Sequence, residues 1–209
     1  MHAYEIAPDF WGWTGRHDGI GADVSSFYYR AGQDVLLFDP LLPPEDPDGF
    51  WTALDRDVLP IEAQVHVLIT APSHTRSTAA VVERYAGTRV WVADSGTDGV
   101  EERGAVVTDP FAPGDSLPAG VQFFETGKAN EVMYWVPEHH ALIVGNTLYA
   151  GDEGLALCPV PWLPAGTTQE QLRAALGPVL ELGVERVLVS HGAPVLEGGG
   201  ETQRSLAAN

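Results

Sequence analysis

The chain has 209 residues, 44% of them apolar and 19% charged, which is the composition of a globular protein and excludes a disordered one. Its formal net charge of -18 disfavours nucleic acid and anionic membranes as partners, because both repel an acidic surface. No apolar segment is long enough to span a bilayer, and the start, MHAYEIAPDFWGWTG, lacks the cationic and apolar regions of a signal peptide.

Length and cysteine content predict a single cytoplasmic domain. No linker and no change of composition divides the chain, so we expect one domain over residues 1–209. The one cysteine, Cys158, can form no internal disulfide, which is typical of proteins in the reducing cytosol. A homodimer is compatible with the sequence, which does not indicate one.

Strands come first along the chain. Short alternating runs broken by Gly and Pro, namely YEIAPDFWGW, DVSSFYYRAG and DVLLFDPLLP, predict antiparallel strands. DPDGFWTALDRDV predicts a short helix. The β-branched run Val65–Thr70 predicts a strand, and a helix follows over Ser77–Tyr85. TRVWVAD and GAVVTD predict further strands.

The second half repeats this alternation of strands and helices. GVQFFETG, GLALCPVPW and VERVLVSHGAPVL predict strands, and EVMYWVPEHHALIVGN predicts a hairpin that turns at Pro137–His140. TTQEQLRAALGPVLELG predicts a helix with a Thr N-cap that ends at Gly183. The glycine run at 198–200 predicts a turn before a C-terminal helix. These elements indicate two packed mixed sheets with helices on their outer faces.

The order VLLFDP, VLITAPSHTRSTAAVV, YWVPEHHALIVGNTL, VLVSHGAPV resembles the metallo-β-lactamase superfamily over roughly residues 20 to 200. The resemblance implies an α/β fold of the αββα sandwich type, with a site at the sheet edges where metal ions activate water. It also implies a signature H-x-H-x-D-H after a strand, then a His, an Asp and a late His. The corresponding positions here hold Ala71, Ser73, Thr75, Arg76, either Gly127 or Lys128, Asn146 and His191.

These replacements predict that the metal site is lost. A catalytic zinc needs about three ligands from His, Cys or carboxylate side chains. His191 and an off-register His74 supply two at most, and a cationic Arg76 would repel the ion. We therefore expect no metal and no cofactor.

The same replacements favour a small anionic ligand. Both carboxylate positions became neutral, while Arg76 and, in one register, Lys128 add positive charge, and arginine suits a bidentate grip on an anion. Arg76 and Lys128 are the candidate ligand-binding cations, with Ser73 and Asn146 as hydrogen-bonding partners. The candidate catalytic residues are His74, as a general base, and His191.

Each candidate also has a structural explanation. His191 and His74 could serve as loop or capping histidines, Arg76 as an ion-pair partner and Lys128 as an ordinary surface lysine. Two other functions stay open: a metal-dependent hydrolase with a thinned site, and a catalytically inactive partner or scaffold. An enzyme of this kind would be hydrolase-like, or a lyase or cyclase without zinc or cofactor.

Other prominent residues favour structural roles, namely His66, His139, His140 and a buried Cys158. The aromatic group Phe10, Trp11 and Trp13 either lines the mouth of a pocket or covers an edge of the core.

Overall fold

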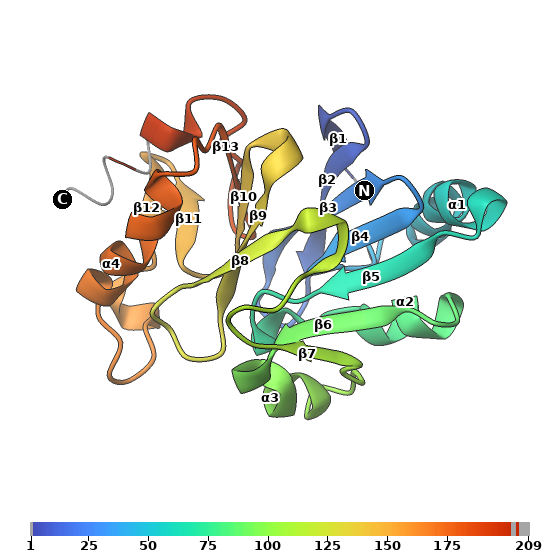
Figure 1. The fold of residues 1–209 in the computed structure, drawn as a ribbon, viewed down its shortest axis with the longest axis horizontal. Coiled ribbons are helices and arrows are strands. Elements are labelled where there is room, and N and C mark those ends of the chain that lie inside the picture. The colour runs from blue at the N-terminus through green and yellow to red at the C-terminus, as the bar shows by residue number, and fades with distance from the viewer. Residues whose placement is uncertain (1, 202–203, 205–209) are drawn as a thin grey trace. The chain divides into compact units, whose positions relative to one another are not determined.

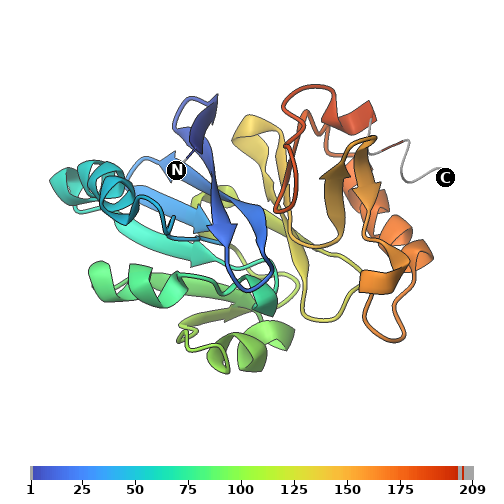
Figure 2. The same cartoon turned by 180° about the vertical axis from the view of Figure 1, so that it is seen from behind.

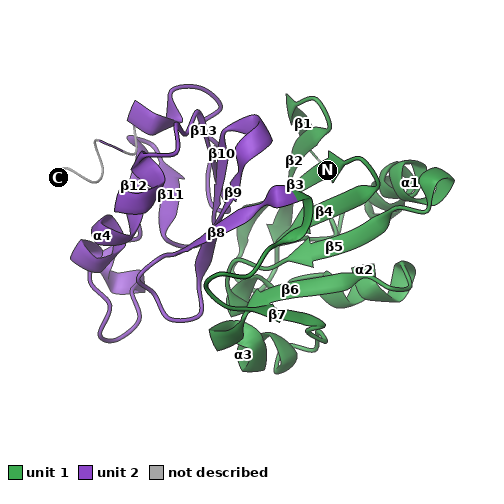
Figure 3. Cartoon of the chain, in the orientation of Figure 1, with its two compact units in different colours: residues 1–119 green, residues 120–209 purple. Residues whose placement is uncertain are grey.

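The computed structural model describes residues 2–201 and 204. The chain divides into two compact units, residues 1–119 (unit 1) and residues 120–209 (unit 2), shown in green and purple in Figure 3. The expectation of one domain over residues 1–209 stays a prediction.

Unit 1 is built on a seven-stranded sheet whose strands lie in chain order (Figure 1). The strands are β1 (His2–Ala7), β2 (Phe10–His17), β3 (Ala22–Ala31), β4 (Asp34–Phe38), β5 (Gln64–Leu68), β6 (Arg89–Ala93) and β7 (Asp109–Phe111). The pairs from β1 to β4 are antiparallel, and those from β4 to β7 are parallel. Parallel strands need crossover connections, and the connecting helices are α1 (Pro47–Val58), α2 (Thr78–Arg84) and α3 (Thr97–Glu101).

One face of this sheet packs against the connecting helices (Figure 2). Alternate residues along a strand point to the same face, and in β5 these are Val65 and Val67. Helix α1 packs Phe50, Leu54 and Val58 against the same cluster, a spacing that places them on one side of the helix. The helix-side core of unit 1 is therefore aliphatic and aromatic.

Unit 2 contains a four-stranded sheet in the order β13, β10, β9, β8 and a separate two-stranded sheet. Its strands are β8 (Gln122–Glu125), β9 (Val132–Val136), β10 (Ala141–Val144), β11 (Leu148–Gly151), β12 (Gly154–Leu157) and β13 (Arg186–Val189). Helix α4 (Gln169–Leu180) begins at a capping box between Thr168 and Gln171 and packs Leu172, Leu176 and Val179 into the core.

Most predicted elements are confirmed. The hairpin of β9 and β10 turns through Pro137–His139, and α2 lies within the predicted helix Ser77–Tyr85. The strand predicted from GAVVTD is wrong for most of its length, because only Asp109–Phe111 pairs with β6. Val106, at the centre of that run, is 67% exposed and belongs to a loop. The predicted C-terminal helix lies largely outside the described residues.

Within residues 2–201 and 204, no helix combines the length and apolar character needed to cross a bilayer.

Candidate functional site

In unit 1 the candidate residues lie in the loop that follows β5. The residue before a proline favours an extended backbone, and Ala71 is extended before Pro72 starts a short 3₁₀ turn over Pro72–His74. The Oγ1 of Thr75 closes the turn by donating a hydrogen bond to the Pro72 carbonyl at 2.8 Å. The loop therefore holds its residues in a fixed backbone path.

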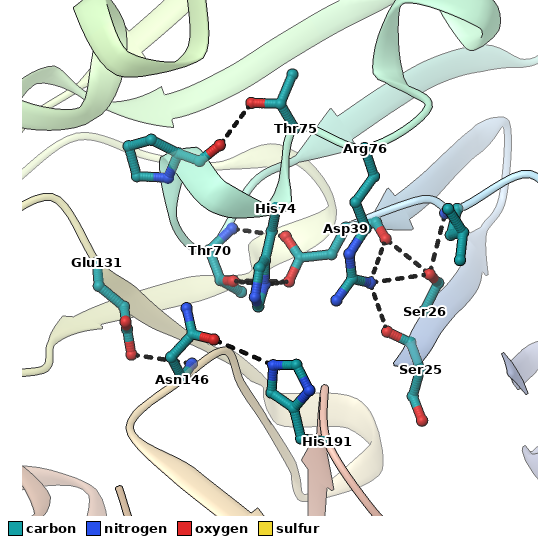
Figure 4. A network of polar contacts seen from close by, with 12 residues as sticks. Ser25, Ser26, Asp39, Thr70, His74, Thr75, Arg76, Glu131, Asn146 and His191 are labelled. Carbon is teal, nitrogen blue, oxygen red and sulfur yellow. Dashed lines mark hydrogen bonds and ion pairs between the residues drawn. The ribbon is translucent and has the colours of Figure 1, made fainter. Parts of the chain in front are cut away.

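A buried carboxylate, Asp39, organises this loop. Because β4 and β5 are parallel, with Phe38 opposite Leu68, the residues after both strands meet at one sheet edge. Asp39 accepts hydrogen bonds from the Thr70 backbone N–H at 2.8 Å, from Thr70 Oγ1 at 2.6 Å and from His74 Nδ1 at 2.7 Å (Figure 4). The carboxylate thus joins the end of β4 to the loop after β5.

The Asp39 contact fixes the tautomer of His74. An ionised carboxylate only accepts hydrogen bonds, so Nδ1 of His74 carries a proton and donates it to Asp39. Burial alone would raise the pKa of Asp39, but the charge of His74 and its hydrogen bond hold that pKa below its usual value. Asp39 therefore stays ionised beside His74.

Arg76 enters the same network from the end of the loop. Its Nη1 donates to the Ser25 carbonyl at 2.7 Å, to Ser26 Oγ at 3.2 Å and to the Asp39 carbonyl at 2.8 Å (Figure 4). Its Nη2 is buried and has no hydrogen-bond partner among the described residues. Burial lowers the pKa of Arg76, against the opposing charge of Asp39. Nη1 of the guanidinium thus makes hydrogen bonds, whereas the buried Nη2 makes none with the described residues.

Asp39 and Arg76 also share an unusual backbone conformation. Their φ angles are 49° and 41°, in the left-handed region, which Asp adopts more readily than Arg, so the strain lies mainly at Arg76. Such strain persists only where surrounding contacts impose it, and it is common at functional sites.

In unit 2 the candidate residues gather at one edge of the four-stranded sheet. The parallel pair β10 and β13 sets Val144 opposite Val189, so that Asn146 and His191, each two residues further along, lie at the same edge. His191 Nε2 and Asn146 Oδ1 are 3.1 Å apart (Figure 4). The sheet register therefore explains why these two side chains meet.

Lys128 is a buried partner of a buried acid. Its Nζ donates to the Asn146 carbonyl at 2.6 Å and lies 3.5 Å from Glu131 Oε2. Glu131 Oε1 accepts from the Asn146 backbone N–H at 3.1 Å and from Thr147 Oγ1 at 2.5 Å. The positive charge of Lys128 is thus already balanced within unit 2, and both groups hold the backbone around Asn146.

The structure brings the candidates together in two groups, one in each unit. His74 and Arg76 share Asp39, whereas Ser73, in the same loop, is exposed. Lys128 and His191 share Asn146. That all of them form one site stays a prediction.

Sequence reasoning missed the acids of both groups, Asp39 and Glu131. Each has a signal in the sequence, because Asp39 directly follows the apolar run VLLF and Glu131 directly precedes VMYWV. For Asp39, a buried strand that ends in an acid indicates a carboxylate at a sheet edge, where the parallel neighbour β5 also ends. Glu131 instead precedes β9, whose neighbours are antiparallel.

The residues present do not fit the metal ions that the family resemblance implies. No group of three His, Cys, Asp or Glu side chains in the described part of the chain could hold a metal ion. In unit 1, the ring nitrogen Nδ1 of His74 is taken by Asp39, and the guanidinium of Arg76 lies against the same residue. A dication needs several anionic or imidazole ligands, and a fixed guanidinium opposes it.

Solved structures of metallo-β-lactamases match nearly the whole chain. The metallo-β-lactamase from Pontibacter korlensis is 15% identical with a TM-score of 0.73, over 100% of this chain and 99% of that one. The DIM-1 metallo-β-lactamase is 12% identical with a TM-score of 0.76, over 99% and 96%. FIM-1 from Pseudomonas aeruginosa, in its mono-zinc form, is 14% identical with a TM-score of 0.71, over 99% and 94%.

No protein-family model and no curated protein matches the chain. Identities this low establish the fold and nothing finer. The chain has the metallo-β-lactamase fold, as the order of its four sequence segments predicts.

Proposed function

We propose that this protein is a metal-independent, cytoplasmic member of the metallo-β-lactamase fold that binds a small anionic ligand. The observation that carries the proposal is the buried Nη2 of Arg76, which has no hydrogen-bond partner among the described residues. A buried N–H group without an acceptor is costly, and a charged one more so. A carboxylate or phosphate oxygen would satisfy it with a charge-assisted hydrogen bond.

The contacts of Nη1 support a binding role for the guanidinium. Its three acceptors belong to Ser25, Ser26 and Asp39, so the group is oriented before any ligand arrives. An arginine held in this way loses little conformational entropy on binding, which favours affinity. Ser73, exposed in the same loop, is the proposed second donor to the ligand.

His74 is the proposed acid–base group. Asp39 holds its Nδ1 at 2.7 Å and thereby fixes the orientation of the imidazole ring. A carboxylate that orients an imidazole and stabilises its charged form is a recurring device in general acid–base catalysis. In unit 2, His191 is the proposed second catalytic residue and Asn146 a proposed ligand-binding residue. Lys128 supports this pair by holding the backbone of Asn146.

Zinc is not part of the proposal, although one of the similar solved structures is a mono-zinc form. The family positions hold Ala71, Ser73, Thr75 and Arg76 where the resemblance implies ligands, and none of these four is a zinc ligand.

The test compares anion binding and stability in Arg76→Ala and Arg76→Lys. Oxalate and inorganic phosphate are titrated by calorimetry, and thermal unfolding is followed on the same samples. One charge-assisted hydrogen bond is worth about 1.5–3 kcal/mol, so Arg76→Ala should weaken binding by about tenfold or more. Arg76→Lys keeps the positive charge but loses the paired N–H donors of the guanidinium, so its anion affinity should lie between those of wild type and Arg76→Ala.

The matched control is Arg84→Ala, which removes an arginine that pairs with Asp55 in the same unit. It should leave anion binding unchanged. Loss of stability without loss of anion binding in Arg76→Ala would assign Arg76 a structural role. A wild-type protein that binds neither anion would favour the inactive partner or scaffold function.

A further inference from the structure

Unit 1 has a cavity of about 210 Å³ between the helix side of its sheet and α1, apart from the loop after β5. It is lined mainly by apolar side chains, among them Trp11, Trp13, Tyr28, Leu37, Phe50 and Ala53. Two of the three aromatic residues that the sequence assigns to a pocket mouth or a core edge, Trp11 and Trp13, thus line a cavity.

The strand register and two small residues create this space. Trp11, Tyr28 and Leu37 lie directly opposite one another on β2, β3 and β4 and form a row across the sheet. Ala3 on β1 and Ala53 on α1 also line the cavity, and their side chains are too short to fill it. The row therefore packs against α1 incompletely, and Trp11 stays 41% exposed.

One polar atom in this lining makes no hydrogen bond of normal geometry with a described residue. Tyr28 is 9% exposed, and its Oη is buried with no hydrogen-bond partner among the described residues. Burial raises the pKa of Tyr28, and so do the charge and the nearby hydrogen-bonding oxygen of Asp57 at the rim. The phenol therefore stays protonated and can donate a hydrogen bond, and Asp57 is a distorted acceptor that a ligand oxygen would improve on. A buried hydroxyl without a partner is unfavourable, so an acceptor is needed.

We propose that this cavity binds a small neutral aromatic molecule whose carbonyl or similar oxygen accepts a hydrogen bond from Tyr28. A cavity of about 150 Å³ lined by apolar side chains holds one benzene ring, so this volume suits a single ring with a short substituent. Trp and Phe side chains favour a flat apolar partner.

Charge at the rim excludes a charged ligand. The carboxylate of Asp57 lies beside the cavity and disfavours an anion there. Arg56 also lines the cavity, and its Nε lies 3.5 Å from Asp57 Oδ1. The rim therefore carries one positive and one negative charge, which disfavours a cation as well. A cation would also leave Tyr28 without an acceptor.

Acetophenone is the probe, because it joins one ring to one carbonyl. Binding is followed by NMR through the indole N–H signals of Trp11 and Trp13, with an expected dissociation constant in the millimolar range for a ligand of this size. Tyr28→Phe keeps the ring and removes the donor, and should weaken binding about fivefold. Ala53→Leu should abolish binding by filling the mouth from α1.

The matched control is Thr52→Leu, at an exposed position next to Ala53 that does not line the cavity, and it should bind acetophenone as wild type does. Thermal unfolding checks that each variant is folded. The absence of binding in wild type, equal affinity in Tyr28→Phe, or tighter binding of the phenyltrimethylammonium cation than of acetophenone would each overturn the proposal.

Discussion

Asp39 is the residue on which the unit 1 network depends. It accepts hydrogen bonds from Thr70 and His74 through its side chain and from Arg76 through its carbonyl. Removing one partner of a buried charged pair leaves the other uncompensated. A single carboxylate thus links two strand ends, a histidine and an arginine.

Asp39→Asn should lower the free energy of unfolding by about 3 kcal/mol or more at neutral pH, the usual cost of breaking a buried pair. The pKa of Asp39 is lowered in the folded state, so its contribution is present above the unfolded value of about 3.9 and is lost as pH falls through the folded pKa. The gap between wild type and variant should therefore persist down to about pH 4 and close below it. Urea unfolding at a series of pH values measures this, and a gap that already closes between pH 7 and 5 would contradict it.

Whether a residue's role can be predicted depends on what fixes that role. His191 and Arg76 could be singled out because a family pattern assigns their positions. Asp39 has a weaker signal, its place after the apolar run VLLF, but its partners follow from the register of β4 against β5, which the sequence does not state. The sequence predicts Lys128 as a ligand-binding cation, although its partner Glu131 is only three residues away. The contacts of Glu131 with Asn146 and Thr147 depend on the pairing of β9 with β10, which no local pattern contains.

At the scale of elements, His66 connects three neighbouring strands. The Trp91 indole N–H on β6 donates to His66 Nδ1 at 3.0 Å, so Nε2 carries the proton and donates to Asp34 on β4 at 3.2 Å. This arrangement requires the neutral ring, because a second proton on Nδ1 would break the bond to Trp91.

Wild type should therefore lose more stability than His66→Gln as pH falls from 7 to 5. Burial lowers the pKa of His66, against the effect of Asp34, so its contribution is present above the unfolded value of about 6.5 and is lost as pH falls through the folded pKa. The slope for one proton cannot exceed ~1.4 kcal/mol per pH unit. Denaturant unfolding of both proteins at each pH separates the effect of His66 from that of the other histidines. Parallel plots of unfolding free energy against pH for the two proteins would contradict this prediction.

Elements were predicted well where one local pattern decides them. Helix α4 has its Thr168 cap and its spaced leucines in the sequence, and both are present in the structure. The run GAVVTD is rich in β-branched residues, yet only its last residue, Asp109, belongs to β7, and Thr108 bonds to Val90 of β6 just before it. Whether such a run forms a strand depends on the neighbouring strand with which it pairs, and the local sequence does not specify that strand.

At the scale of the whole molecule, the proposal of a metal-independent protein predicts how the metallo-β-lactamase fold of this chain responds to zinc. Adding zinc should leave the melting temperature unchanged, because a ligand stabilises a protein only through a site that the folded state provides. Calcium at equal concentration is the control, since a chain with net charge -18 attracts any dication weakly. A saturable rise with zinc but not with calcium would show that the metal site is retained.

The burial of Lys128 has a practical consequence. It is the only lysine in the chain, it is 8% exposed, and its Nζ is engaged by the Asn146 carbonyl. Reagents that acylate amines can reach this side chain only when the surrounding segment opens, because the folded protein shields it. The rate of acylation at Lys128 would therefore report how often this part of unit 2 opens, through a reporter that needs no engineering.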